Sequence, residues 1–126
     1  MADYREISQT YAKGAINTAM IVNAGAAVAL LSQLGELMDN GLIGVVRPAM
    51  EVWTFGIAAA AFAWVAGFTS TRYVDRSERE PKKLTDHLRM ANALMFAGML
   101  LVAMSIGCFL YGCGHIAGSF ETFGGR

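Results

Sequence analysis

The chain has few charged residues, and this shortage alone argues against an ordinary soluble domain and against a nucleic-acid-binding protein. Only 16% of its 126 residues are charged, against about a quarter in an ordinary soluble domain. Its ten basic and ten acidic residues cancel to a net charge of zero. Because nucleic-acid binding needs a basic face, we predict no nucleic-acid partner.

Metal-binding and disulfide-forming groups are also scarce. The two cysteines, Cys108 and Cys113, lie five residues apart, so on a helix they point to different faces and are too distant for a local disulfide. The two histidines, His87 and His115, are about 42 Å apart on one helix and cannot hold one haem together. Cys113 and His115 alone are too few ligands for a metal site. We therefore predict no metal and no cofactor.

Motifs for catalysis and transport are missing as well. The sequence contains no serine-nucleophile motif, no phosphate-cradling glycine loop and no HExxH pair. No Asp, Glu, Lys or Arg lies near the middle of its three apolar segments, where proton pumps and ion-coupled transporters usually carry one. There is also no inverted repeat of the kind that small transporters tend to show. We predict a protein without catalytic residues that is not an enzyme.

Three long apolar segments are what the sequence does have, at 14–35, 50–71 and 90–116. Apolar residues make up 55% of the chain, and the mean hydropathy is +0.41. Each segment is about as long as the ~20 residues that a helix needs to cross a bilayer. The sequence predicts an all-α integral membrane protein with three antiparallel transmembrane helices. The alternative is a soluble bundle of unusually apolar helices.

The basic residues predict how these helices are oriented. Eight of the ten lie before the first segment or between the second and third. Basic residues near spans favour the cytoplasmic side, so segments 1–13 and 72–89 are expected in the cytoplasm. The 36–49 loop and the 117–126 tail then face outward. This places the protein in the bacterial inner (plasma) membrane, with its N-terminus cytoplasmic and its C-terminus outside.

The first two helices are expected to extend beyond the membrane. Nothing breaks the first helix between its polar start at 1–13 and Gly35. The second is expected to run from Pro48, in its first turn, to the residue before Pro81. Those 33 residues reach about 50 Å, more than the ~30 Å hydrocarbon core. The charged run at 72–89 is either a solvated face or a surface for a cytoplasmic partner. Thr85 is a plausible N-cap of the third helix, whose glycine-rich end at 107–118 is expected to fray.

Polar and small residues within the apolar segments are the candidate pore-lining or helix-packing residues. Asn23 lies near the middle of the first segment and either joins helices by a hydrogen bond or lines a pore. Small residues recur at every fourth position of the second segment, which lets helices approach closely. Acidic residues at the outer ends would form a carboxylate ring around a pore mouth, and such rings favour cations. The packing and lining candidates are Asn17, Asn23, Gln33, Ala59, Ala63 and Gly67, and the acids are Glu36, Asp39 and Glu51.

The first apolar segment also carries a resemblance. Its sequence NAGAAVALL at 23–31 resembles the NxGAAxALL helix of a loose set of small, uncharacterised bacterial membrane proteins. The likeness continues in the Ser-x3-Phe-x2-Gly ending formed by Ser105, Phe109 and Gly112. In size and number of spans the chain is also similar to three-helix phage holins and to small membrane effectors of anti-phage systems. The resemblance implies three spanning helices and carries over no activity.

Together these features lead to two functional hypotheses. The first is a non-enzymatic membrane protein that self-associates in the lipid bilayer and forms a pore or channel, as a lysis or defence effector would. Three helices cannot enclose a useful channel alone, so a pore needs several copies. The alternative is an accessory subunit of a larger membrane complex, which would co-purify with foreign subunits and conduct nothing alone.

Overall fold

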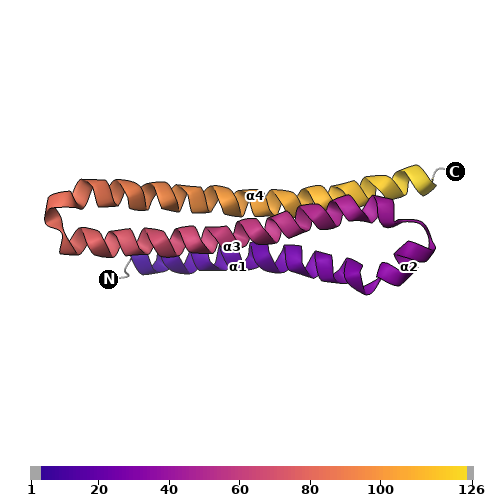
Figure 1. Ribbon diagram of the computed structural model, residues 1–126, viewed down its shortest axis with the longest axis horizontal. Helices are drawn as coiled ribbons and strands as arrows, with labels where there is room; N and C mark the ends of the chain where they lie inside the picture. The colour runs from indigo at the N-terminus through magenta and orange to yellow at the C-terminus, as the bar shows by residue number, and fades with distance from the viewer. Residues whose placement is uncertain (1–3, 125–126) are drawn as a thin grey trace.

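The computed structural model describes residues 4–124, which form an all-α bundle without strands in that range. Helix α1 spans Tyr4–Ser32, and the short α2 spans Leu34–Asp39. Helix α3 spans Ile43–Arg79, the 3-10 turn η1 spans Pro81–Lys83, and α4 spans Leu84–Gly124. Figure 1 shows α3 folding back along α1, and α4 folding back along α3. The three long helices are each long and apolar enough to cross a membrane.

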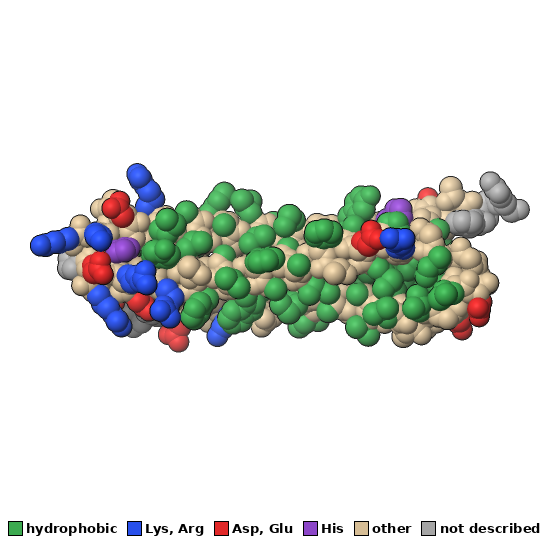
Figure 2. Space-filling view, viewed as in Figure 1, with side chains coloured by type: hydrophobic (Ala, Val, Ile, Leu, Met, Phe, Trp, Pro, Cys, Tyr) green, Lys and Arg blue, Asp and Glu red, His purple; other side chains and the backbone are tan. Residues whose placement is uncertain are grey.

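Large apolar side chains lie on the outside of this bundle and small ones inside it, the reverse of the arrangement in a soluble bundle. The interior between the helices consists mainly of small residues, among them Ala19, Ala49, Ala60 and Ala91, whose side chains are almost completely buried. Large apolar side chains instead cover the outer surface, and Figure 2 shows them over the middle of the molecule, with charged side chains towards its ends. Soluble monomers rarely expose contiguous apolar surface on this scale. A hydrocarbon environment accounts for both features, because in lipid small residues let helix backbones approach closely.

Hydrogen bonds between α3 and α4 fix their relative register. The Trp53 indole nitrogen donates to the Phe109 carbonyl at 3.2 Å. Further along α3, the Ser70 hydroxyl donates to the Ala91 carbonyl at 2.8 Å. Residue numbers rise along α3 as they fall along α4, so the two helices form one long hairpin closed by η1.

The start of α3 differs from the prediction. The helix begins at Ile43, so Pro48 lies in its second turn, and the expected loop at 36–49 contains both α2 and the beginning of α3. The physical reason is burial: Val46 is only 4% exposed and Ala49 is fully buried, which favours a helix that begins early enough to pack both. The turn itself is confined to the residues around Gly41, whose φ of 68° suits glycine.

The expectation that α3 ends before Pro81 is confirmed, since the helix stops at Arg79. The two ends of α4, in contrast, differ from the prediction. However, α4 begins at Leu84, so Thr85 lies in its first turn and is not its N-cap. The glycine-rich part at 107–118 does not fray, because α4 continues to Gly124. There Gly112 packs closely against Trp53, and such tertiary contacts override the weak helix propensity of glycine.

Candidate functional site

A buried polar cluster joins all three long helices inside the bundle. Asn23 of α1 is 0% exposed, and so is Ser105 of α4. The Asn23 amide nitrogen donates to the Ser105 carbonyl at 3.0 Å and to its hydroxyl oxygen at 3.1 Å. It also donates to the Ala19 carbonyl one turn back, at 2.8 Å. The Ser105 hydroxyl donates onward to the Gly56 carbonyl of α3 at 2.7 Å. One chain of hydrogen bonds therefore links α1 to α4 and α4 to α3.

Gly56 is the position that lets Asn23 enter this cluster. A Cβ added at Gly56 would overlap the Asn23 side-chain amide, so any larger residue would displace it. The Asn23 oxygen Oδ1 is buried and has no hydrogen-bond partner among the described residues. It lies instead against the α carbon of Gly56, where a weak Cα–H···O contact is the interaction open to it.

A second close approach joins α3 and α4 at Trp53, one helical turn before Gly56 on α3. Trp53 is 4% exposed, and its ring lies where a Cβ of Gly112 would be. Its indole N–H is satisfied by the Phe109 carbonyl, as a buried tryptophan requires. This pair and the Asn23 cluster together fix α3 against α4 over two adjacent turns.

Towards the η1 end of the bundle, α1 and α3 line a groove of about 500 Å³. Gly67 of α3 forms part of its wall, and a Cβ there would meet no atom within 4 Å. The Lys13 ammonium lies 5.9 Å from the Trp64 ring centroid in this groove. The Trp64 indole N–H in turn donates to the Asn17 side-chain oxygen at 3.4 Å.

The η1 end also holds a small polar contact between α4 and Glu80, the residue that follows α3. The His87 side chain is 16% exposed, and its Nε2 lies 3.6 Å from a Glu80 carboxylate oxygen. The Tyr73 ring packs against the imidazole, with 6.1 Å between ring centroids. This contact closes the α3–α4 hairpin. His115 lies far away near the other end of α4, where Tyr111 stacks on it.

The structure places the candidate pore-lining or helix-packing residues in two different environments. Ala59 and Ala63 of α3 are buried in the interior, at 4% and 1% exposure, as Asn23 of α1 is at 0%. The other three candidates are exposed on the bundle surface, with Gly67 facing the groove. These exposed residues are Asn17, Gln33 and Gly67. The structure thus buries Asn23, Ala59 and Ala63 and leaves the other three candidates exposed.

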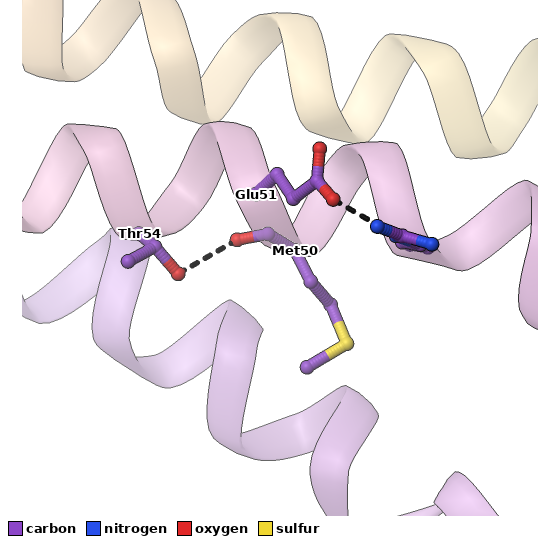
Figure 3. Close-up of polar contacts among 4 residues, drawn as sticks. Met50, Glu51 and Thr54 are labelled. Atoms are coloured by element: carbon purple, nitrogen blue, oxygen red, sulfur yellow. Dashed lines mark hydrogen bonds and ion pairs between the residues drawn. The ribbon is translucent and has the colours of Figure 1, made fainter.

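The three acidic candidates are all exposed and lie at the end of the bundle opposite η1. Glu36 and Asp39 belong to α2, and Glu51 lies in the third turn of α3. Glu51 forms the ion pair predicted from its i,i+4 spacing, with 2.9 Å to the Arg47 guanidinium. Figure 3 shows this ion pair, and beside it the Thr54 hydroxyl donating to the Met50 carbonyl. At this end, therefore, one of the three acids already has a cationic neighbour.

Sequence reasoning missed Ser105 as the partner of Asn23. Its signal was the one serine of the apolar segment at 90–116, and polar residues at such positions usually turn inward to find a partner. Elsewhere, Cys108 is half-buried and Cys113 exposed, both as free thiols. In the part of the chain that the structure describes, no three His, Cys, Asp or Glu side chains come together as a metal site. Comparison with protein-family models, with curated proteins and with solved structures gives no match for this chain.

Proposed function

We propose that this chain is a non-enzymatic integral membrane protein whose copies assemble through α1 and form a pore. The carrying observation is the outer face of α1. Gly14, Thr18, Gly25 and Ser32 share one side of the helix by their i,i+4 and i,i+7 spacing, and all four are exposed. The interior of the subunit is already filled by α3 and α4, so this face is open to a further helix.

The chemistry of that face supports a protein partner more than it supports lipid. A Cβ at Gly14 or Gly25 would meet no atom within 4 Å, so a neighbouring backbone has room to approach closely. Small residues at four-residue spacing favour such contacts in membranes. Asn17 borders the same face, and exposed amides at membrane depth are costly in hydrocarbon. A second copy or a water-filled lumen offers them partners.

The distribution of charge supports a membrane orientation. Among the described residues, the η1 end carries the basic side chains Arg72, Arg76, Arg79, Lys82, Lys83 and Arg89. The opposite end carries Arg47 together with the three acids. By the positive-inside rule, the η1 end with the start of α1 is cytoplasmic and the α2 end faces outward. The protein then lies in the bacterial inner membrane as three antiparallel crossings, with α1 and α3 extended on the cytoplasmic side.

In a ring of such subunits, Glu36 and Asp39 repeat around the outer mouth and favour cations. Among the described residues, neither forms an ion pair with a basic side chain, whereas Glu51 pairs with Arg47. Lysis or defence against phage is the role in which a small pore of this kind acts.

The test is the native mass in lipid together with ion flux. Wild-type protein in lipid nanodiscs should have a mass that is a multiple of 13.5 kDa, and vesicles containing it should release potassium. Gly25→Leu should abolish both assembly and flux, because it fills the open face of α1. Ala58→Leu is the matched control, since Ala58 is also an exposed small residue but lies on α3. A monomer that releases no ions would overturn the proposal, and co-purified foreign subunits would replace it with the accessory-subunit role.

A further inference from the structure

One outward face of α3 changes from apolar to basic along the helix. Val65 and Phe68 are exposed on this face, at 60% and 62%. The next positions on the same face, by i,i+3 and i,i+4 spacing, are the exposed Arg72, Arg76 and Arg79. A single stripe of the helix therefore offers an apolar surface followed by three cations.

The change falls where the hydrocarbon of a membrane would end. Glu51 and Arg72 are successive charged residues of α3, and the 20 residues between them are uncharged. Twenty helical residues rise about 30 Å, which is the thickness of a hydrocarbon core. If the bundle spans the membrane as proposed above, Phe68 faces acyl chains and Arg72 lies at the boundary with the headgroups. Arg76, one turn further on, then lies among the headgroups.

Two of the arginines share a hollow on the surface of α3. Arg72 and Arg76 line this hollow of about 260 Å³, and its other lining residues are Phe68, Thr69 and Tyr73, so no carboxylate borders it. The Arg72 guanidinium lies 5.8 Å from the Phe68 ring centroid. The Arg76 guanidinium lies at the same distance from the ring centroid of Tyr73. Stacking on these rings holds both guanidiniums beside the hollow and leaves their N–H groups free to bind an anion.

The carboxylates closest in sequence do not neutralise these arginines. Asp75 lines an adjoining hollow together with the three arginines, but among the residues that the structure describes it forms no ion pair with them. Three arginines and one aspartate leave a net charge of +2 around the two hollows. The Glu80 carboxylate, four residues after Arg76, lies instead 3.6 Å from Nε2 of His87. The face therefore keeps an excess of positive charge.

The combination of the two halves of this face points to an amphiphilic anion. Guanidinium groups form strong, forked hydrogen bonds with phosphate. A free phosphate or an acidic protein segment would satisfy the arginines but would have nothing that matches the apolar half. An anionic phospholipid matches both halves in the same order, with acyl chains in the hydrocarbon and a phosphate at its edge.

We propose that this face of α3 is a binding site for an anionic phospholipid of the phosphatidylglycerol class. Its phosphate lies between Arg72 and Arg76, and an acyl chain lies along Phe68 and Val65. The inference rests on the membrane placement of the proposed function but not on pore formation. Because the site lies on α3, a bound lipid leaves the assembly face of α1 free and ties the η1 end of the hairpin to the inner leaflet.

The experiment is native mass spectrometry of the detergent-purified chain, titrated separately with dioleoyl phosphatidylglycerol and with dioleoyl phosphatidylethanolamine, whose phosphate is offset by an ammonium group. We expect phosphatidylglycerol to bind at least about fivefold more tightly. Replacing both arginines (Arg72→Gln with Arg76→Gln) should weaken its binding about 25-fold, since each basic residue at a lipid surface contributes about fivefold.

The matched control removes two cations outside this face. Lys82→Gln with Lys83→Gln alters η1 and should change phosphatidylglycerol binding less than about twofold. All four substituted side chains are exposed, so neither double variant disturbs the packed interior. Equal binding of the two lipids, or equal losses in the two double variants, would overturn the site and leave only a general attraction between basic residues and anionic lipid.

Two competitors separate a lipid from other anions. Glycerophosphoglycerol, the same headgroup without acyl chains, should bind at least about tenfold more weakly, because it buries no apolar surface along Phe68. Hexaglutamate at the same concentration should not displace the lipid. Equal binding of the deacylated headgroup would assign the arginines to a soluble phosphate, and displacement by hexaglutamate would assign them to an acidic protein. Either result would overturn the lipid site while leaving the membrane placement intact, whereas a chain that stays soluble without detergent would contradict the proposed function itself.

Discussion

Helices α3 and α4 pack against each other much more closely than either packs against α1. Along α3–α4, glycine brings one backbone against a large side chain, as at Gly112 and Trp53, and hydrogen bonds recur from Trp53 to Ser70. Helix α1 is held by the buried Asn23 and, nearer the η1 end, borders α3 across a groove bridged by the hydrogen bond from Trp64 to Asn17. The difference indicates a closely packed α3–α4 hairpin with a third helix held by fewer contacts, among them the Asn23 hydrogen bonds and the one from Trp64 to Asn17. Much of α1 is therefore left exposed to other molecules.

The largest expected effect comes from disturbing the close packing of α3 against α4. Gly112→Ala should destabilise the chain by about 1–3 kcal/mol, the usual cost of overpacking, because its Cβ would overlap the buried Trp53 ring. Gly114→Ala, two residues along the same helix, has open space at its Cβ and should be neutral or gain up to about 1 kcal/mol. Unfolding of both variants in mixed detergent micelles measures the difference. Equal stabilities would contradict the close packing of α3 on α4.

The next largest effect comes from removing the hydrogen bonds between Asn23 of α1 and Ser105 of α4. In a double-mutant cycle of Asn23→Ala and Ser105→Ala, the coupling should be about 0.6–1.7 kcal/mol, the range found for hydrogen bonds between membrane helices. Hydrogen exchange in Asn23→Ala should rise along α1 and stay unchanged along α3 and α4. A coupling near zero, or exchange that rises equally in all three helices, would show that Asn23 is not the point of attachment.

A slightly smaller effect tests whether the Trp53 contact is packing or hydrogen bonding. Trp53→Phe removes the indole N–H that donates to the Phe109 carbonyl and should cost about 0.5–1.5 kcal/mol. The smaller ring should also partly restore the stability of Gly112→Ala, since it vacates the space that the new Cβ needs. The same micelle unfolding assay measures both. If Trp53→Phe worsened the Gly112→Ala defect, steric overlap would not be its cause.

The smallest effect lies on the surface. The Arg47 and Glu51 side chains are 78% and 60% exposed, and exposed ion pairs contribute little because water screens them. Arg47→Ala should therefore change stability by at most about 0.5 kcal/mol. It should, however, strengthen any cation selectivity of the pore, because it leaves Glu51 without its cation. Reversal-potential measurements on vesicles with unequal salt on the two sides would show this. An unchanged potential would mean that Glu51 does not line the pore mouth.

The sequence predicted the long elements well because they depend on local signals. The continuous first helix, the end of α3 before Pro81 and the three membrane-length apolar helices all follow from apolar pattern, helix breakers and length. It failed at Pro48, Thr85 and the glycines of α4, where burial and close packing override local preference. The partner of Asn23 lies 82 residues away, and the groove depends on how α1 leans, so neither has a local signature. The resemblance to small bacterial membrane proteins, the orientation and the pore stay predictions.

Membrane crossing itself is tested most directly by cysteine accessibility along α3, in a background of Cys108→Ala and Cys113→Ala. Cysteine is introduced singly at Glu51, Phe62 and Arg72 and treated with a membrane-impermeant maleimide in intact and in opened cells. Phe62 is 65% exposed in the isolated bundle, yet lipid should cover it, so Phe62→Cys should not be labelled from either side. Glu51→Cys should be labelled in intact cells, and Arg72→Cys only after the cells are opened. Rapid labelling at position 62, or labelling of both ends from the same side, would contradict the account.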